Sequence, residues 1–388
     1  MIRWLTALVA AVVWQAAPLQ AAPLPPPPPV PAAIPVALLV DLGSGQTLYA
    51  RDPARRFMPA SVTKVMTAYT AFRLVEQGRL RLDAQFLYTP ELEAAWYGEG
   101  SNMFLRAGER PTIDQLLLGV TTVSGNDASV ALAEAATGSL DAWLALMNAE
   151  AARLGMRDTH FASASGFPDG GRTYTTAHDL ALLGEALTQE FPGLYRRFFG
   201  HRSLTWRGLT QVNHDPITGR VLGADGMKTG FTNEAGYTFL GSAERNGRRL
   251  VMVLAGSPRG SMRDEAARGL IEWGFAQFRL APLFAPGAIV GQARVQEGSR
   301  RHVALVAPDG VAVSLPLGAQ PAPGGAWRLA IAYDGPLRAP LDAGEEVATL
   351  RLLDGETVVM ETPLVAGEAV ARAGLWRRIV NGLAGLVA

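Results

Sequence analysis

The order of apolar and polar positions predicts strands at both ends of a first domain, with helices between them. Residues 36–40 and 47–50 are apolar runs separated by Gly43, Ser44 and Gly45, a pattern typical of a β-hairpin. From about residue 61 to residue 187 the apolar positions follow a helical spacing instead. The predicted helices are 61–76, ended by Gly78; 112–118, opened by Pro111; and 128–136, with Asn126 or Asp127 as N-cap and Gly138 beyond its end.

Strands return near Met227. Residues 237–243 and 250–255 flank Asn246-Gly247, the strongest short-range signal for a hairpin. A further helix is predicted over 265–278. Strands that enclose a helical middle favour a single antiparallel sheet with helices on its faces, so we expect an α+β domain over residues 36–280.

A second domain is predicted over residues 285–371, where the composition shifts to Gly, Pro and Val in short alternating runs. Residues 327–333 and 357–360 are two of its expected strands. This region carries no cluster of chemically useful side chains, so we expect a small all-β domain without a site of its own.

The N-terminus has the layout of a secretory signal peptide over residues 1–21. Arg3 precedes an almost wholly apolar run, 4–14, that is too short to span a bilayer, and Ala21 offers a small residue for cleavage. The proline-rich segment 22–35 cannot form helix or sheet ladders, and we expect an extended spacer.

The C-terminal residues 372–388 predict an amphipathic helix. Arg377, Arg378 and Asn381 share one face, and the opposite face carries Leu375, Trp376, Ile379, Val380, Leu383, Leu386 and Val387. A helix of this kind lies in the headgroup layer of a membrane, and docking on the β-domain is the alternative. We therefore expect a periplasmic protein attached peripherally to the outer face of the cytoplasmic membrane.

Composition narrows the chemistry. The chain of 388 residues has 35 Lys and Arg against 35 Asp and Glu, and this zero net charge argues against a nucleic-acid partner. It has no cysteine, which excludes disulfides and thiolate catalysis. Its 5 His are scattered singly, so we expect neither a metal site nor a cofactor.

Three short motifs occur in order: Ser61-Val62-Thr63-Lys64, Ser124-Gly125-Asn126 and Lys228-Thr229-Gly230. Each is weak alone, but their order on a helix start, a loop and a strand points to serine chemistry. A serine hydroxyl needs a base to become a nucleophile, and positions three apart on a helix share a face, so Lys64 can accept the Ser61 proton if its amine is neutral.

The other motif residues suit the handling of a peptide. Ser124 can relay a proton to the leaving amine, and Asn126 can hydrogen-bond the substrate or Lys64. Lys228 and Thr229 can hold a terminal carboxylate, and Gly230 leaves room for an extended substrate at the strand edge. The backbone amides of Ser61 and Phe231 are the expected oxyanion donors.

These motifs resemble those of the serine-type D-Ala-D-Ala carboxypeptidases, the low-molecular-mass penicillin-binding proteins (peptidase family S11). The resemblance covers about residues 34–280 and is strongest at 59–61, 101–105, 124–128, 147–148, 154–156, 159–161, 225–230 and 235–237. It implies a DD-peptidase/β-lactamase-like α+β fold, followed by the β-domain and terminal helix. It also implies an acyl-enzyme on Ser61, a peptidoglycan stem peptide as substrate and β-lactams as inhibitors.

The resemblance also assigns residues. Ser61 would be the nucleophile, Lys64 the base, Ser124 the proton relay and Lys228 the carboxylate holder, while Arg263 falls where the family often has an arginine near the carboxylate. A surface arginine is the alternative for Arg263. Two departures concern the rim: Phe231 stands where His or Tyr is common, and Asp215 where Asn is frequent.

Three other functions stay open at this point. A β-lactamase shares the motifs, but residues 155–184 contain no glutamate to activate a deacylating water. A D,D-endopeptidase is closer, although such relatives generally lack the second domain and terminal helix. A non-catalytic wall-binding scaffold would be expected to have lost Ser61, Lys64 or Lys228.

Overall fold

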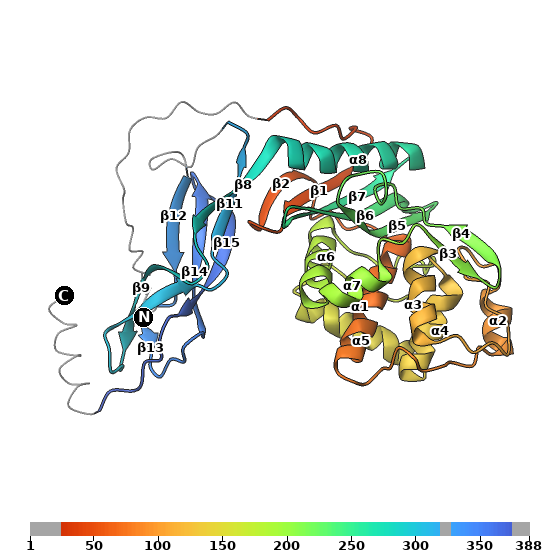
Figure 1. The fold of residues 1–388 in the computed structure, drawn as a ribbon, viewed down its shortest axis with the longest axis horizontal. Helices are drawn as coiled ribbons and strands as arrows, with labels where there is room; N and C mark the ends of the chain where they lie inside the picture. Colours follow the sequence, from red (N-terminus) through yellow and green to blue (C-terminus); the bar gives the residue numbers. More distant parts are fainter. Residues whose placement is uncertain (1–24, 319–326, 375–388) are drawn as a thin grey trace, which may run out of the picture. The chain divides into compact units, whose positions relative to one another are not determined.

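The computed structural model describes residues 25–318 and 327–374, which form two compact units (Figure 1). The N-terminal unit comprises Pro26–Leu42 and Thr47–Ala276, and the C-terminal unit comprises Gly43–Gln46 and the residues from Gln277 onward. The predicted signal peptide 1–21, the start of the proline-rich segment and nearly all of the predicted terminal helix 372–388 lie outside the described residues.

A five-stranded antiparallel sheet forms the centre of the N-terminal unit, in the order β2-β1-β7-β6-β5. The strands are β1 (Val36–Asp41), β2 (Gln46–Arg51), β5 (Ala224–Thr232), β6 (Gly236–Arg245) and β7 (Arg248–Ser257). The predicted Asn246-Gly247 turn joins β6 to β7, and β1 pairs with β7, so strands from both ends of the unit share one sheet as expected. Strand β5 lies at the edge, which leaves one side of its backbone open to a ligand.

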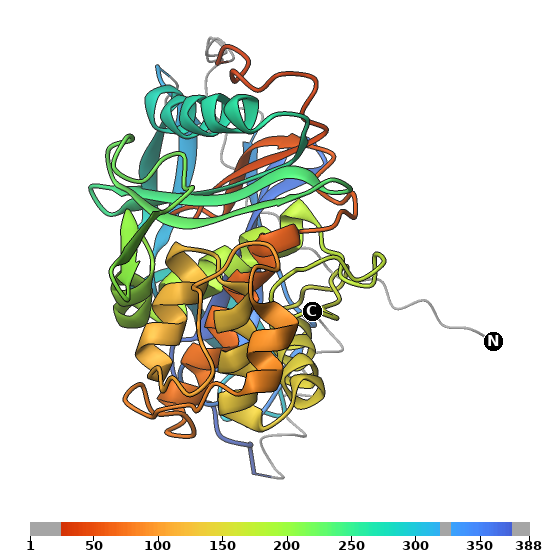
Figure 2. The same cartoon turned by 90° about the vertical axis from the view of Figure 1, so that its right-hand side faces the viewer.

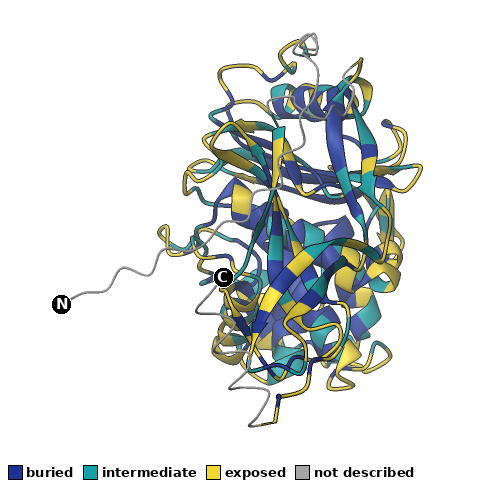
Figure 3. Ribbon diagram, turned by 90° about the vertical axis from the view of Figure 1, so that its left-hand side faces the viewer, coloured by how far each residue is buried: buried dark blue, intermediate teal, exposed yellow. Residues whose placement is uncertain are grey.

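Helices cover both faces of this sheet (Figures 1 and 2). On one face lies α8 (Gly260–Gln277), and on the other lies a lobe formed by α1 (Thr63–Glu76), α2 (Pro90–Trp96), α3 (Ile113–Thr122), α4 (Asn126–Thr137), α5 (Leu140–Arg153), α6 (Ala177–Glu190) and α7 (Pro192–Phe198). Because both faces are covered, β6 and β7 are continuous buried runs without an apolar-polar alternation, and the buried residues fill the interior (dark blue in Figure 3). Helix α1 runs through the lobe and is buried on almost every side.

The helix starts agree with the sequence to within one residue in one case and differ in another. Helix α3 begins one residue after its predicted start, with Thr112 as N-cap in a capping box with Gln115. Helix α4 begins two residues earlier than expected, with Gly125 as N-cap, so neither Asn126 nor Asp127 caps it. Both side chains are used elsewhere, as described below.

The proline-rich segment packs on the N-terminal unit from Pro26 onward. Trp273 of α8 donates a hydrogen bond to the carbonyl of Pro26 (2.7 Å), Arg51 donates to that of Ile34 (2.8 Å), and Val30 is buried. The described part is therefore docked along the domain, where the sequence predicted a spacer. Because its prolines lack N–H groups, this segment cannot pair in a regular ladder, and side chains of the domain satisfy the carbonyls of Pro26 and Ile34 instead.

The described part of the C-terminal unit is all-β, as predicted. Its six-stranded sheet has the order β12-β14-β15-β10-β9-β13, and β8 pairs with β11. The strands are β8 (Phe278–Phe284), β9 (Ala288–Gln296), β10 (His302–Ala307), β11 (Val311–Pro316), β12 (Trp327–Ala332), β13 (Leu337–Arg338), β14 (Glu346–Asp354) and β15 (Thr357–Ala366). Because β8 belongs to this unit, the division falls a few residues before the predicted boundary at 280–285.

Within the described ranges, no single helix is long and apolar enough to cross a membrane, while α4 and α5 together, bent by 90°, meet the criterion of length and composition. Both helices contribute side chains to the buried core.

Candidate active site

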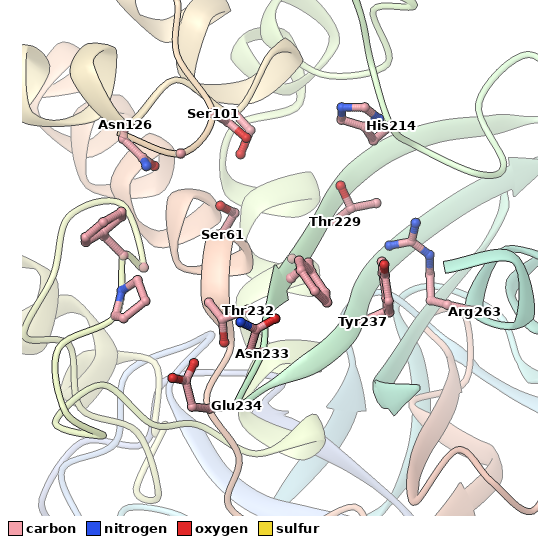
Figure 4. Close-up of a pocket in the computed structure, with 17 residues that line it drawn as sticks. Ser61, Ser101, Asn126, His214, Thr229, Thr232, Asn233, Glu234, Tyr237 and Arg263 are labelled. Carbon is pink, nitrogen blue, oxygen red and sulfur yellow. The ribbon is translucent and has the colours of Figure 1, made fainter. Parts of the chain in front are cut away.

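A cleft of about 630 Å³ opens beside the N-terminal end of α1 (Figure 4). Of the predicted site residues, those that line it are Ser61, Ser124, Asn126, Thr229, Gly230, Phe231 and Arg263. The other two, Lys64 and Lys228, are buried, with 1% and 3% of their surfaces exposed. The structure thus brings together residues that are far apart in the sequence.

Ser61 lies in a short 3-10 helix, η1 (Ala60–Val62), that leads directly into α1. This arrangement places Lys64 one turn later on the same face, and its Nζ lies 3.0 Å from the Ser61 Oγ. The hydroxyl and the amine are therefore in hydrogen-bonding contact, which proton transfer requires.

The other partners of Lys64 are both oxygen acceptors. Its Nζ donates to the Asn126 Oδ1 at 2.7 Å and to the backbone carbonyl of Ser165 at 2.7 Å. The Asn126 Nδ2 donates to the carbonyl of Glu99 (2.8 Å), which fixes the amide with its oxygen toward Lys64. A neutral amine has two N–H groups, and these two acceptors take both. Its lone pair is then left for the hydroxyl proton of Ser61.

The environment of Lys64 favours this neutral form. Complete burial lowers the pKa of Lys64 well below its usual range, and the positive charge of Lys228 lowers the pKa further. Asp127 opposes the shift, but its carboxylate is occupied by backbone amides.

Asp127 and Gly166 hold the walls of the site. The Asp127 carboxylate accepts hydrogen bonds from the amides of Met103 (2.8 Å) and Leu105 (3.0 Å), and so fastens the loop that carries Ser101 to the start of α4. A Cβ at Gly166 would lie 1.8 Å from the Ala60 carbonyl oxygen. Only glycine permits this approach, which brings the neighbouring Ser165 carbonyl to Lys64.

Strand β5 forms the opposite wall. A Cβ at Gly230 would lie 2.5 Å from the Pro59 carbonyl oxygen and 3.2 Å from the Ser61 amide nitrogen. Glycine is therefore required where β5 passes the nucleophile, and the Ser61 amide lies beside the strand at this point. The amides of Ser61 and Phe231 stay the predicted oxyanion donors.

Two basic side chains, Lys228 and Arg263, form a cationic group at this wall. Burial lowers the pKa of Lys228 to about 7, and the charge of Arg263 adds to the effect. Arg263 is 6% exposed and donates to the Thr238 carbonyl (3.2 Å) and to Asp264 (2.7 Å), so it is not the surface arginine of the alternative interpretation. Because the charge of Arg263 disfavours the protonated form of Lys228, an anion bound beside them, such as the carboxylate expected of the substrate, would stabilise that protonated form.

Sequence reasoning missed several contributors. Ser165 and Glu99 act through backbone carbonyls, which leave no side-chain signature. His214 lines the cleft, and burial, Lys228 and Arg263 lower its pKa, in that order of size. Tyr237 also lines the cleft, and its ring stacks on that of Phe231, a predicted and half-exposed residue, with centroids 4.3 Å apart. Across the described ranges, no group of three or more His, Asp or Glu side chains is arranged to hold a metal ion.

Comparison with known proteins agrees with this geometry. A family model described as D-alanyl-D-alanine carboxypeptidase matches residues 26–258, and a model of the C-terminal domain of penicillin-binding protein 5 matches residues 278–372. The chain belongs to the D-alanyl-D-alanine carboxypeptidase family, peptidase family S11.

Its relatives in this family resemble it over most of their length. The carboxypeptidase DacD of Salmonella typhimurium is 32% identical over 362 residues, covering 92% of this chain and 90% of the relative. Penicillin-binding protein 5 from Haemophilus influenzae superposes with a TM-score of 0.76 at 28% identity, covering 90% of this chain and 100% of that one. Penicillin-binding protein 6B from Escherichia coli gives 0.66 at 28% identity, with coverage of 90% and 99%. The predicted family is confirmed, and so are the predicted α+β fold and the all-β domain that follows it; the terminal helix of that prediction lies outside the described residues.

The environment of Lys64 generates a pH prediction. Because the amine must be neutral to accept a proton, the first-order rate of acylation at saturating β-lactam should rise with pH through the lowered pKa of Lys64 and then level off. Stopped-flow measurements from pH 5 to 10 separate this rate from the binding constant of the β-lactam, which depends on the protonation of Lys228. An acylation rate that does not change over that range would contradict Lys64 as the base.

Proposed function

We propose that this protein removes the C-terminal D-alanine from peptidoglycan stem peptides that end in D-alanyl-D-alanine, through an acyl-enzyme on Ser61. The observation that carries the proposal is the contact of the Ser61 Oγ with a buried amine whose other partners are both acceptors. Membership in the carboxypeptidase family supports the same reaction.

The contact between Ser61 and Lys64 supports the first half of the proposed reaction. The substrate lies extended along β5, with its carboxylate held by Lys228, Thr229 and Arg263. The Ser61 Oγ attacks the carbonyl carbon of the penultimate residue while Lys64 takes the hydroxyl proton. The amides of Ser61 and Phe231 stabilise the resulting oxyanion, a contribution of about 10² to 10³ in rate per donor in related chemistry.

The second half returns the proton. Ser124 relays it from Lys64 to the amine of the departing D-alanine, and the carbon–nitrogen bond breaks to leave an ester on Ser61. Water then attacks this ester with Lys64 again as the base, and the acid and Ser61 are released. A β-lactam enters the same path because it presents a carboxylate beside a reactive amide carbonyl.

The protein works in the cell envelope, where its family acts on the wall. Within the envelope we propose the periplasm, with peripheral attachment to the cytoplasmic membrane through residues 372–388. The support is the sequence of that segment, which sets an apolar face containing Trp376 against Arg377 and Arg378.

Replacement of the nucleophile tests the reaction. Ser61→Ala should lose covalent labelling by a fluorescent penicillin and D-alanine release together, because neither can proceed without the hydroxyl. Mass spectrometry of a pentapeptide muropeptide and a cross-linked dimer should show that the wild-type protein removes one alanine and leaves the dimer intact. Cleavage of the dimer alone would instead indicate an endopeptidase, and labelling of Ser61→Ala would disprove the acyl-enzyme.

Lys228 generates a test of carboxylate binding. Lys228→Ala should lose about 10- to 100-fold in kcat/KM on a peptide acid, the size of a lost charge-assisted hydrogen bond. It should lose much less on the same peptide amidated at its C-terminus. Loss of the Lys228 charge also changes the pKa of Lys64. The amidated peptide controls for this change, since it affects the hydrolysis of both substrates. Equal losses of kcat/KM on the acid and the amide would contradict the role of Lys228 in carboxylate binding.

The proposed attachment makes a fractionation prediction. Truncation after Ala371 should release a soluble, active protein, because the amphipathic segment is lost while both units are kept. Binding of the full-length protein to anionic vesicles should weaken as salt screens its arginines. Identical partitioning of the two forms between membrane and soluble fractions would rule out the anchor.

A further inference from the structure

A second, smaller pocket lies at the base of the hairpin formed by β3 (Ser203–Trp206) and β4 (Leu209–Val212), which Figure 1 labels. It measures about 60 Å³ and is lined by three basic side chains and their neighbours: His201, Arg202, Arg220, Asn213, Asp215 and Thr218. Among the described residues, the two cavities share none, and His214 alone of the segment 213–220 lines the catalytic cleft. The smaller pocket is therefore separate from the catalytic cleft.

Hydrogen bonds across the base of the hairpin hold this pocket in place. The amide of Asn213 donates to the Arg202 carbonyl (2.9 Å), and the Asn213 Nδ2 donates to the His201 carbonyl (2.8 Å). The His201 Nε2 donates in turn to the carbonyl of Arg197 in the last turn of α7 (2.7 Å). The backbone that carries two of the basic side chains is thus fixed on both sides.

The side chain of Arg202 lies over the turn at Gly219. A Cβ at Gly219 would lie 3.1 Å from the Arg202 Nε and 3.3 Å from its Cζ, and the φ of +72° falls in the region that favours glycine. Glycine therefore leaves room for the guanidinium group. Arg220 is the next residue in the chain, so this turn brings two guanidinium groups to one pocket.

The positive charge of this pocket is not neutralised within the described structure. Arg202 and Arg220 form no ion pair with any of residues 25–318 or 327–374. The carboxylate of Asp215 is occupied within its own loop, where it accepts hydrogen bonds from the amides of Ile217 (2.9 Å) and Thr218 (3.1 Å) and from the Thr218 hydroxyl (2.6 Å). Like charges at one pocket repel, and a bound anion would offset that repulsion.

The size and the donors of the pocket indicate the class of ligand. A volume of about 60 Å³ holds a few water molecules, so it suits a single oxyanion group better than a sugar ring or a peptide. The planar fork of a guanidinium group binds phosphate oxygens in pairs. Both arginines are exposed, so the rest of a larger molecule would extend into solvent.

We propose that this pocket binds a phosphate group, held by Arg202 and Arg220. The group can belong to free phosphate or to a phosphodiester such as a lipid headgroup, because both present the same charged oxygens. This inference goes beyond the proposed carboxypeptidase reaction and does not depend on it.

Calorimetric titration of the full-length protein with inorganic phosphate, at low ionic strength, tests the site. Arg202→Gln and Arg220→Gln should each weaken phosphate binding about five-fold, the size of an exposed ion pair. Arg157→Gln is the matched control, since Arg157 is an exposed arginine after α5 that does not line the pocket, and it should keep the wild-type affinity. Lys228→Ala should also keep it, which separates this site from the cations of the catalytic cleft.

Two further ligands identify the source and the class of the anion. If glycerophosphoglycerol, a soluble phosphodiester headgroup, binds as inorganic phosphate does, the ligand is a phosphodiester; if inorganic phosphate alone binds, it is the free anion. Acetate should bind more weakly than either, because it carries one charge on a smaller planar group.

Three results would overturn the inference. These are an absence of phosphate binding in the wild type, an affinity unchanged in the Arg202→Gln/Arg220→Gln double variant, and an equal loss in Arg157→Gln. Acetate binding as tight as that of phosphate would overturn the assignment of the ligand class. None of these results bears on D-alanine release, so the carboxypeptidase function is judged separately.

Discussion

The burial of one lysine amine is the constraint on which the site depends. An ammonium group removed from water would lose its hydration, so a buried lysine is stable when it is neutral or when acceptors surround it. Here Asn126, Ser165 and Ser61 supply three oxygen atoms. Each comes from a different part of the chain, and the fold must bring all three to one point.

Several features of the N-terminal unit keep Lys64 away from solvent and bring these three oxygen atoms to its amine. Helix α1 is buried on almost every side, which removes Lys64 from solvent. Asp127 ties the loop of Ser101 to the start of α4, next to Asn126, and Gly166 and Gly230 let two backbones approach η1 closely. Two of these features are glycines, and the carboxylate of Asp127 binds backbone amides, so the geometry of the site depends on the main chain as much as on the motif residues.

This explains what the sequence could and could not predict. Ser61, Lys64 and Lys228 stand in local motifs on regular elements, and the strands of the sheet followed from apolar runs and the turn signals between them, so local rules sufficed. The carbonyls of Ser165 and Glu99 became visible only through tertiary contacts. The N-cap of α4 was predicted wrongly because Asp127 competes for more distant amides, and the proline-rich segment docks because Trp273 and Arg51 satisfy its carbonyls.

The two buried lysines show how one site holds opposite protonation states. Burial lowers the pKa of both, and Lys228 lowers the pKa of Lys64 further. Lys64 has hydrogen-bond acceptors but no free carboxylate beside it, so the neutral amine is the stable form and can act as a base. Lys228, with a pKa of about 7, lies beside Arg263 at the place proposed for the substrate carboxylate, whose negative charge would favour its protonated form. The surroundings of the two lysines thus favour different charges, so that Lys64 suits the role of the base and Lys228 that of the binding group. The substrate completes this separation, because it brings the anion that Lys228 lacks and presents its carbonyl to a serine whose base is already neutral.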